Sequence, residues 1–122
     1  FANGADLDVK ARFPDRPWPT NNCRDGFVFT APTASFQANA FGLFDMLGNT
    51  WEWTADCWHD NYEGAPMDGS VWGEENGGNC SRRVVRGGGW NNPPRNLRPA
   101  FRNGNTTDEA NNLLGIRLAR EL

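Results

Sequence analysis

The chain has 122 residues, 38% of them hydrophobic, with 14 glycines, eight prolines, six tryptophans and a formal net charge of −3. This length suits a single domain over residues 1–122, and no apolar run approaches the roughly 18 residues that a membrane-spanning helix needs. Eight arginines lie in residues 81–122, but glycine and asparagine interrupt them. We therefore expect them to hold loops by hydrogen bonds rather than to bind nucleic acid.

The first half of the chain is predicted to contain one short helix and two short strands. The helix is expected over Asp6–Arg12, and the alternation of aromatic and small residues in Gly26–Pro32 predicts a strand. A helical turn over 44–47 is expected next, followed by a Gly48-Asn49 turn and an apolar strand that ends at Trp53.

The second half is predicted to be mostly loop. Two polar stretches without hydrophobic period, 54–81 and 91–112, separate a strand over Arg83–Trp90 from a final strand over Leu114–Ala119. Loops of that length are uncommon in a compact domain unless they are functional or anchored. The pattern predicts an irregular α+β domain of short strands and long ordered loops, anchored by metal ions, a disulfide or arginine networks.

With three cysteines, one histidine and no Cys-x-x-Cys pair, the sequence does not predict a zinc site of the usual kind. Cys57 and Cys80 flank the first polar loop, so we expect a disulfide between them with Cys23 free; in a reducing compartment the alternative is no disulfide. His59 is interpreted as a surface or loop-packing residue rather than a catalytic base, and no nucleophile–base pair is apparent.

Three motifs carry a resemblance to a known family: FGLFDMLGNTWEWT at 41–54, RRVVRGGGWNN at 82–92 and LLGIRLAR at 113–120. In order and spacing they resemble the formylglycine-generating-enzyme (sulfatase-modifying-factor) superfamily. The resemblance implies a variant of the C-type lectin fold with calcium often bound. It also implies that this chain is the C-terminal part of a longer domain, whose missing N-terminal half would be a partner. No signal peptide is visible at Phe1, and the resemblance leaves cell surface, periplasm and cytoplasm of a bacterium open.

Two calcium sites are expected from the same resemblance. Asp45 and Glu52 place two carboxylates around the Gly48-Asn49 turn, and calcium prefers such hard oxygen ligands. The family pattern implies side-chain ligands from Asp45 and Glu52, with carbonyl ligands from Gly48 and Thr50. The second implied site takes side chains of Asn3 and Asp25 and carbonyls of Gly4 and Phe27. The alternative is that these carboxylates cap turns and pair with arginine.

Copper and iron are not expected. The family's oxidase binds copper through two cysteines, because soft thiolates select Cu(I), and the matching positions here are Pro94 and Pro99. One histidine cannot rebuild the histidine-rich iron site of the related sulfoxide synthases. We therefore expect a non-catalytic module that binds a protein or small molecule. The alternative is part of a catalytic family oxidoreductase whose remaining active-site residues lie outside this chain.

An asparagine-rich surface is the predicted binding face, because asparagine suits turns and both donates and accepts hydrogen bonds. The segment resembles the variable region of proteins diversified by retroelements; the alternative is a set of local Asx turns in an irregular loop. Its predicted members are Trp90 as aromatic anchor with Asn91, Asn92, Asn96, Asn103, Asn105, Asn111 and Asn112.

Overall fold

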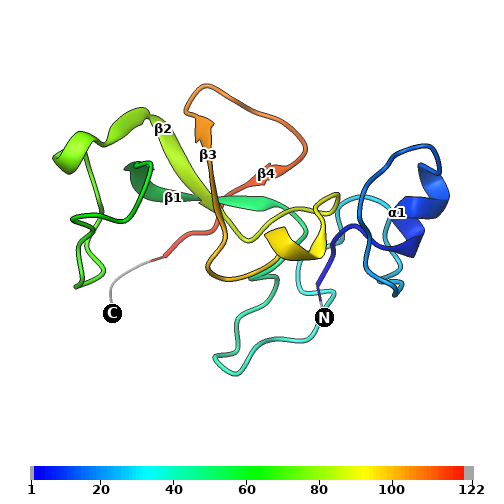
Figure 1. Ribbon diagram of the computed structural model, residues 1–122. Coiled ribbons are helices and arrows are strands. Elements are labelled where there is room, and N and C mark those ends of the chain that lie inside the picture. Colours follow the sequence, from blue (N-terminus) through cyan, green and yellow to red (C-terminus); the bar gives the residue numbers. More distant parts are fainter. Residues whose placement is uncertain (1, 120–122) are drawn as a thin grey trace.

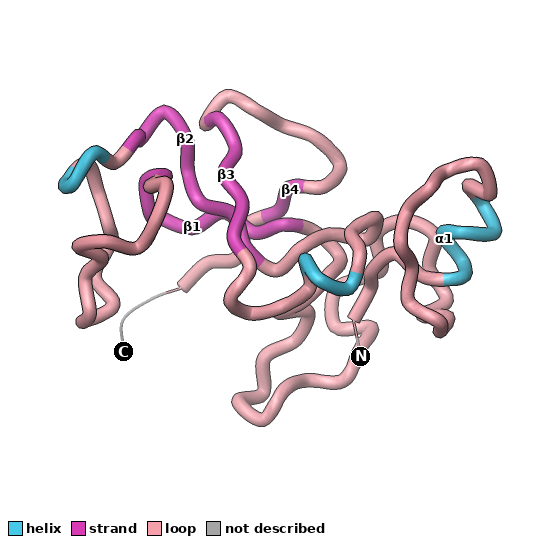
Figure 2. Tube along the Cα trace, in the orientation of Figure 1, coloured by secondary structure: helices cyan, strands magenta, loops and turns pink. Residues whose placement is uncertain are grey.

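The computed structural model describes residues 2–119, most of which are loop and turn (Figure 2). One small sheet of order β3-β2-β1-β4 organises them (Figure 1). The elements in chain order are α1 (Leu7–Arg12), β1 (Trp51–Trp58), the 3-10 helix η1 (Glu75–Gly77), β2 (Asn79–Arg86), the 3-10 helix η2 (Pro94–Asn96), β3 (Arg102–Thr106) and β4 (Leu114–Gly115). None of the described helices is long and apolar enough to cross a membrane.

The sheet is mixed. β2 pairs antiparallel with β1 on one side and with β3 on the other, while β4 joins β1 in parallel through Trp51 and Leu114. The β1–β2 register shifts between Trp53 and Cys57, so β1 bends there, as strands do at a bulge. The β-branched pair Val84 and Val85 lies near the C-terminal end of β2, and both side chains are buried, one on each face of the sheet.

Helix α1 lies away from the sheet and begins where the sequence predicts (Figure 1). Asp6 caps it, with Oδ1 accepting hydrogen bonds from the amides of Asp8 (2.8 Å) and Val9 (3.3 Å). The helix ends at Arg12, shortly before Pro14, because the residue preceding a proline is disfavoured in helical conformation.

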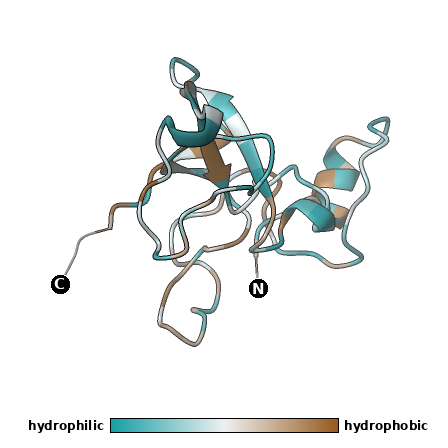
Figure 3. Cartoon of the chain, turned by 60° about the vertical axis from the view of Figure 1, so that its left-hand side comes forward, coloured by the Kyte–Doolittle hydropathy of each residue, from teal (hydrophilic) through white to brown (hydrophobic). Residues whose placement is uncertain are grey.

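The buried apolar side chains include Trp51, Cys57, Val84 and Val85 of the sheet, and Figure 3 shows a strongly hydrophobic stretch of strand beside loops of mixed hydropathy. Trp90 packs edge-on against Phe29 with ring centroids 5.1 Å apart. A disulfide joins Cys57 to Cys80, with Cα atoms 4.5 Å apart, and Cys23 is free and exposed. This bond ties the loop between β1 and β2 to both strands.

Several predicted elements differ from the structure. Residues 26–32 form no strand, because the side chain of Asn49 bonds both the amide (2.9 Å) and the carbonyl (3.2 Å) of Ala31 in place of a neighbouring strand. The predicted turn of helix over 44–47 is absent, since Asp45 has φ +54°. β1 continues past Trp53 to Trp58, β2 begins at Asn79, the 91–112 stretch contains β3, and the last strand is only Leu114–Gly115.

Candidate functional site

The first predicted calcium site comes together in the structure. Asp45, Gly48, Thr50 and Glu52 line a concavity of 190 Å³ together with Arg117. One carboxylate oxygen of Asp45, Oδ2, accepts a hydrogen bond from the amide of Ala34 (2.7 Å). The other, Oδ1, is buried and has no hydrogen-bond partner among the described residues. A buried, unpaired carboxylate oxygen is costly, so this atom has the environment of a ligand position.

Arg117 already supplies a positive charge to this concavity. Its Nε and Nη2 donate to the two carboxylate oxygens of Glu52 at 2.8 and 2.6 Å, in the bidentate geometry of a strong ion pair. Nη2 also donates to the carbonyls of Phe44 (2.9 Å) and Asp45 (3.3 Å). The hydrogen bond to Glu52 raises the pKa of Arg117. The arginine pairing expected as the alternative is therefore present at Glu52, while Asp45 Oδ1 remains unpaired.

The second predicted site centres on Asn3 and Asp25. Asn3 is fully buried, and its Nδ2 donates to the carbonyl of Phe29 (2.7 Å) while its Oδ1 has no partner in the described part of the chain. Asp25 accepts hydrogen bonds from the amides of Gly4 (3.2 Å) and Phe27 (2.9 Å). The four residues are thus brought together, although Gly4 and Phe27 offer Asp25 their amides.

Asp25 belongs to an acidic cluster. Carboxylate oxygens of Asp6, Asp8 and Asp25 lie within 4.8 Å of one another. Burial raises the pKa of Asp25, the amide of Phe27 opposes that shift, and the negative charge of Asp6 adds to it. Desolvation and like charge both disfavour the carboxylate form, and a bound cation would reverse that preference.

The two predicted calcium sites are physically joined. Gly48 forms an isolated parallel β-bridge with Asn3, and the amide of Asn49 donates to the carbonyl of Asn3 at 2.7 Å. The side chain of Asn49 also accepts from Asn3 Nδ2 at 3.3 Å. The two predicted sites therefore share a backbone contact.

The predicted asparagine-rich face does not form one exposed surface. Trp90 is only 6% exposed, so the prediction of an exposed aromatic anchor is wrong; its ring is used in the core against Phe29. Asn91 and Asn96 are half-buried, and Asn91 Oδ1 is buried and unpaired among the described residues. Asn92 Oδ1 accepts the amide of Gly89 at 2.7 Å, as a local structural bond.

The remaining asparagines lie in and after β3. Asn103 is exposed, and its Oδ1 accepts the amide of Gly104 (2.9 Å), while Asn105 is half-buried. Asn111 and Asn112 are exposed in the β3–β4 connection, where Asn111 Oδ1 accepts the amide of Leu113 at 2.9 Å. Local turn bonds thus explain several of these residues, as the alternative interpretation expected. The comparison with retroelement-diversified proteins stays a prediction.

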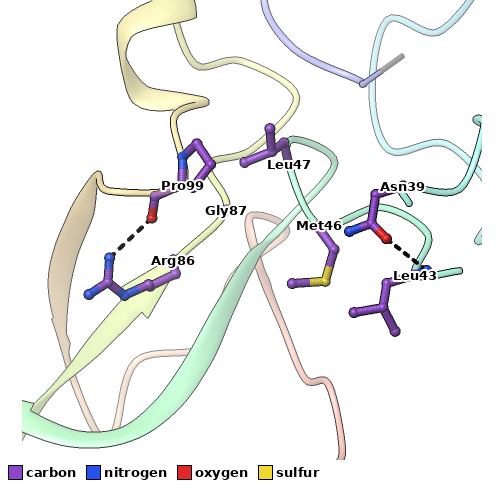
Figure 4. Close-up of a pocket in the computed structure, with 7 residues that line it drawn as sticks. All are labelled: Asn39, Leu43, Met46, Leu47, Arg86, Gly87 and Pro99. Atoms are coloured by element: carbon purple, nitrogen blue, oxygen red, sulfur yellow. Dashed lines mark hydrogen bonds between the residues drawn. The ribbon is translucent and has the colours of Figure 1, made fainter. Parts of the chain in front are cut away.

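A pocket of 410 Å³ was not predicted from the sequence (Figure 4). Its apolar side comes from the loop before β1, and the opposite side from the end of β2 and the segment after η2. Arg86 Nη1 donates to the carbonyl of Pro99 at 3.2 Å across that second side. The lining residues are Asn39, Leu43, Met46, Leu47, Arg86, Gly87 and Pro99. The sequence contained one indication of a site in this region, because Pro99 occupies one of the two positions implied for a copper-binding cysteine.

The lining of this pocket is made of apolar side chains with one arginine and one asparagine. Its seven lining residues include no thiol, carboxylate or imidazole, so the pocket holds neither a nucleophile nor a general base of its own. Pro94 lies in η2 and is outside the lining. His59 is only 4% exposed, stacks on Trp72 with ring centroids 3.5 Å apart, and faces the carbonyls of Cys57 and Glu75. The histidine thus packs a loop, in agreement with the sequence interpretation.

Comparison with known proteins finds one matching family and several similar sequences. Residues 2–122 match the profile of the sulfatase-modifying factor enzyme 1-like domain. The formylglycine-generating enzyme of Bos taurus is 35% identical over 84% of this chain and 27% of its own length. The Bos taurus protein called inactive C-alpha-formylglycine-generating enzyme 2 is 33% identical over 81% of this chain and 29% of its own length.

A solved structure is also similar. PvdO from Pseudomonas aeruginosa superposes with a TM-score of 0.71 at 45% identity, over 80% of this chain and 36% of the PvdO chain. The chain therefore spans less than two fifths of the length of each of these three proteins.

Proposed function

The chain belongs to the sulfatase-modifying factor enzyme 1-like domain family, and on that premise we propose that it is a non-catalytic, calcium-stabilised ligand-binding module. The observation that carries the proposal is Pro99, which lines the 410 Å³ pocket at a position where the family resemblance implies a copper-binding cysteine. The side chain of proline has no donor atom for a metal, and so cannot replace a thiolate ligand. The volume lies within the range of about 300–1,000 Å³ that is usual for small-molecule sites.

Calcium fits the two oxygen-rich groups of residues. Each contains one buried side-chain oxygen without a partner among the described residues, Asp45 Oδ1 in one and Asn3 Oδ1 in the other. Carboxylate, amide and carbonyl oxygens are the ligands calcium prefers. A cation in each site would satisfy its orphaned oxygen, and the cation beside Asn3 would favour the ionised form of Asp25. When the cation binds, the carboxylate of Glu52 would either contact both the cation and Arg117 or lose its ion pair with Arg117. We further propose that the fold is a variant of the C-type lectin fold, which the small mixed sheet and long loops support.

The alternative function is catalytic. In that case the chain would be part of an oxidoreductase of this family whose remaining active-site residues lie outside it. The exposed side chains of Phe41 (87% exposed) and Phe44 (40%) support this alternative, because they offer an apolar surface to further sequence of the domain, such as the longer relatives have.

A copper-dependent turnover assay tests the non-catalytic function, because turnover by this chain would contradict it. The chain, loaded with copper in air, is incubated with a sulfatase-type cysteine peptide, and formylglycine is measured by mass spectrometry. The Bos taurus formylglycine-generating enzyme serves as the positive control. We expect no product above background from this chain, because its copper positions are Pro94 and Pro99. Copper-dependent product would reject the non-catalytic proposal.

A further inference from the structure

Three arginines and two aromatic residues alternate in contact along one side of the sheet. We call this set, Arg82, Trp58, Arg102, Tyr62 and Arg86, the arginine–aromatic ladder. Arg82 Cζ lies 4.5 Å from the centroid of the Trp58 ring, and Arg102 Cζ lies 4.4 Å from the same ring. Arg102 Cζ is also 4.5 Å from the Tyr62 ring, and Arg86 Nη2 donates to the Tyr62 hydroxyl at 3.0 Å. Each cation is thus held by an aromatic neighbour.

Strand pairing fixes the ladder. Arg86 and Arg102 are direct partners in the β2–β3 register, so their side chains leave the same face of the sheet. Arg82, four residues before Arg86, shares that face because strand side chains alternate. Gly104 makes room for the Trp58 ring between Arg82 and Arg102: a Cβ at position 104 would come within 2.5 Å of Trp58 Cε3.

The positive charge of the ladder is not neutralised within the described residues. The ion pairs among residues 2–119 join Arg24 to Asp8 and Arg117 to Glu52, and neither involves the ladder. Arg82 uses Nε on the carbonyl of Gly104 at 2.9 Å. The guanidinium of Arg102, which is half-buried, makes no hydrogen bond to any described residue. A guanidinium has five N–H donors in a planar fork that matches a carboxylate.

The ladder ends at the pocket. Arg86 is both its last member and a lining residue, and it lies across the pocket from the apolar side formed by Leu43, Met46 and Leu47, with its guanidinium turned toward the carbonyl of Pro99 (Figure 4). An apolar wall opposite a cation is complementary to a molecule with an apolar body and one negative group. Because Arg102 is fixed between two rings, little side-chain freedom is lost when it meets such a group.

We propose that the pocket binds a small organic carboxylate, with its apolar body against Leu43, Met46 and Leu47 and its carboxylate at Arg86 and Arg102. The proposal rests on the proposed function, since it names the class of ligand for the same pocket. The competing role for the ladder is purely structural: it would only hold the loop between β1 and β2, through Trp58 and Tyr62, against the sheet.

Paired probes distinguish the two roles. 4-Phenylbutyrate and its neutral analogue 4-phenylbutyramide have the same apolar body, and their affinities for the chain are measured by calorimetry at low salt. We expect the carboxylate to bind about tenfold more tightly, as one charge-assisted contact would give. Arg102→Gln and Arg86→Gln should each remove most of that preference while leaving amide binding within about twofold. Arg16→Gln, at an exposed arginine outside the ladder, is the matched control and should retain the preference.

Each remaining outcome decides against a specific claim. Equal binding of carboxylate and amide to the wild type overturns the carboxylate inference but leaves the pocket as a ligand site. Absence of binding by either probe overturns both the inference and the ligand-binding function. If Arg102→Gln lowers the melting temperature, the test rests on Arg86→Gln, and an unchanged preference in that variant contradicts the proposal.

Discussion

Gly48 and Asn3 approach each other so closely that no other residue fits at position 48. Their backbones form a parallel bridge, Gly48 has φ +79°, and a Cβ there would lie 2.0 Å from the carbonyl oxygen of Asn3. This contact joins the two predicted calcium sites and fixes the turn that precedes β1.

Replacing Gly48 should therefore lower the free energy of unfolding more than replacing a glycine whose only constraint is a positive φ. Gly69 has φ +81°, and a Cβ at that position would meet no atom within 4 Å, so Gly69→Ala carries the conformational cost alone. We expect that variant to lose about 1–2 kcal/mol. Gly48→Ala should lose distinctly more, because the carbonyl of Asn3 must also move. Urea unfolding of both variants measures the difference, and equal losses would contradict the importance of the bridge.

Calcium should stabilise the chain through Asp45. Addition of calcium at about 100 times its dissociation constant should raise the free energy of unfolding by about 2.7 kcal/mol, as mass action requires for a ligand that binds only the folded state. Asp45→Asn should remove much of this increase, since it takes away the charge at the unpaired oxygen. Asp15→Asn, at an exposed aspartate, is the control. Thermal unfolding in chelator and in calcium measures this stabilisation. A wild-type melting temperature that does not rise with calcium would refute the site.

The pH dependence of stability should reflect Asp25. Burial raises its folded-state pKa above the ordinary value of 3.8, so the folded chain binds a proton more strongly than the unfolded chain. The contribution of this group is then fully present below pH 3.8 and is lost as pH rises through the folded pKa. In chelator, Asp25→Asn should flatten this part of the stability curve.

Calcium should oppose the same trend. A cation beside Asp25 favours the carboxylate and lowers its pKa, so the calcium-induced gain in stability should shrink as the solution is acidified. Melting temperatures recorded with and without calcium across the acidic range test both statements. A wild-type calcium effect that is independent of pH would place the cation away from Asp25.

Reduction of the Cys57–Cys80 bond should destabilise the chain substantially. The two residues are 23 positions apart, and closing a loop of that length contributes about 3–4 kcal/mol in the chain-entropy description. A Cys23→Ser variant removes the free thiol from the comparison between oxidised and reduced protein. Intact-mass analysis after thiol labelling should find one reactive thiol in the oxidised wild type, and three would contradict the disulfide.

Local chemistry made part of the fold predictable from the sequence. Asp6 followed by Leu7–Arg12 carries a capping side chain and a helical segment, and the structure begins the helix there. Val84 and Val85 favour a buried strand, and β2 contains both. The family motifs, in turn, anticipated the grouping of Asp45 with Glu52 around one turn.

The other features of the fold and of the candidate site depend on contacts between residues far apart in the sequence, which local patterns do not predict. Gly26–Pro32 alternates like a strand, but the distant side chain of Asn49 takes the hydrogen-bonding groups of Ala31. β3, with the sequence RNGNT, has few strand-forming residues and is extended because β2 pairs with it. Trp90 was predicted as the aromatic anchor of an exposed asparagine-rich face, yet it packs against Phe29. The pocket joins segments that are far apart in the sequence, which no local pattern reports.

The central claim is that the pocket beside Pro99 binds a ligand, and the two methionines of the chain allow a direct test. Met46 lines the pocket, whereas Met67 is 99% exposed elsewhere. With ¹³C-labelled methionine methyl groups, titration with 4-phenylbutyramide should shift the Met46 signal saturably and leave the Met67 signal in place. If both signals stay fixed, or both move to the same extent, the pocket is not a ligand site and the account is wrong.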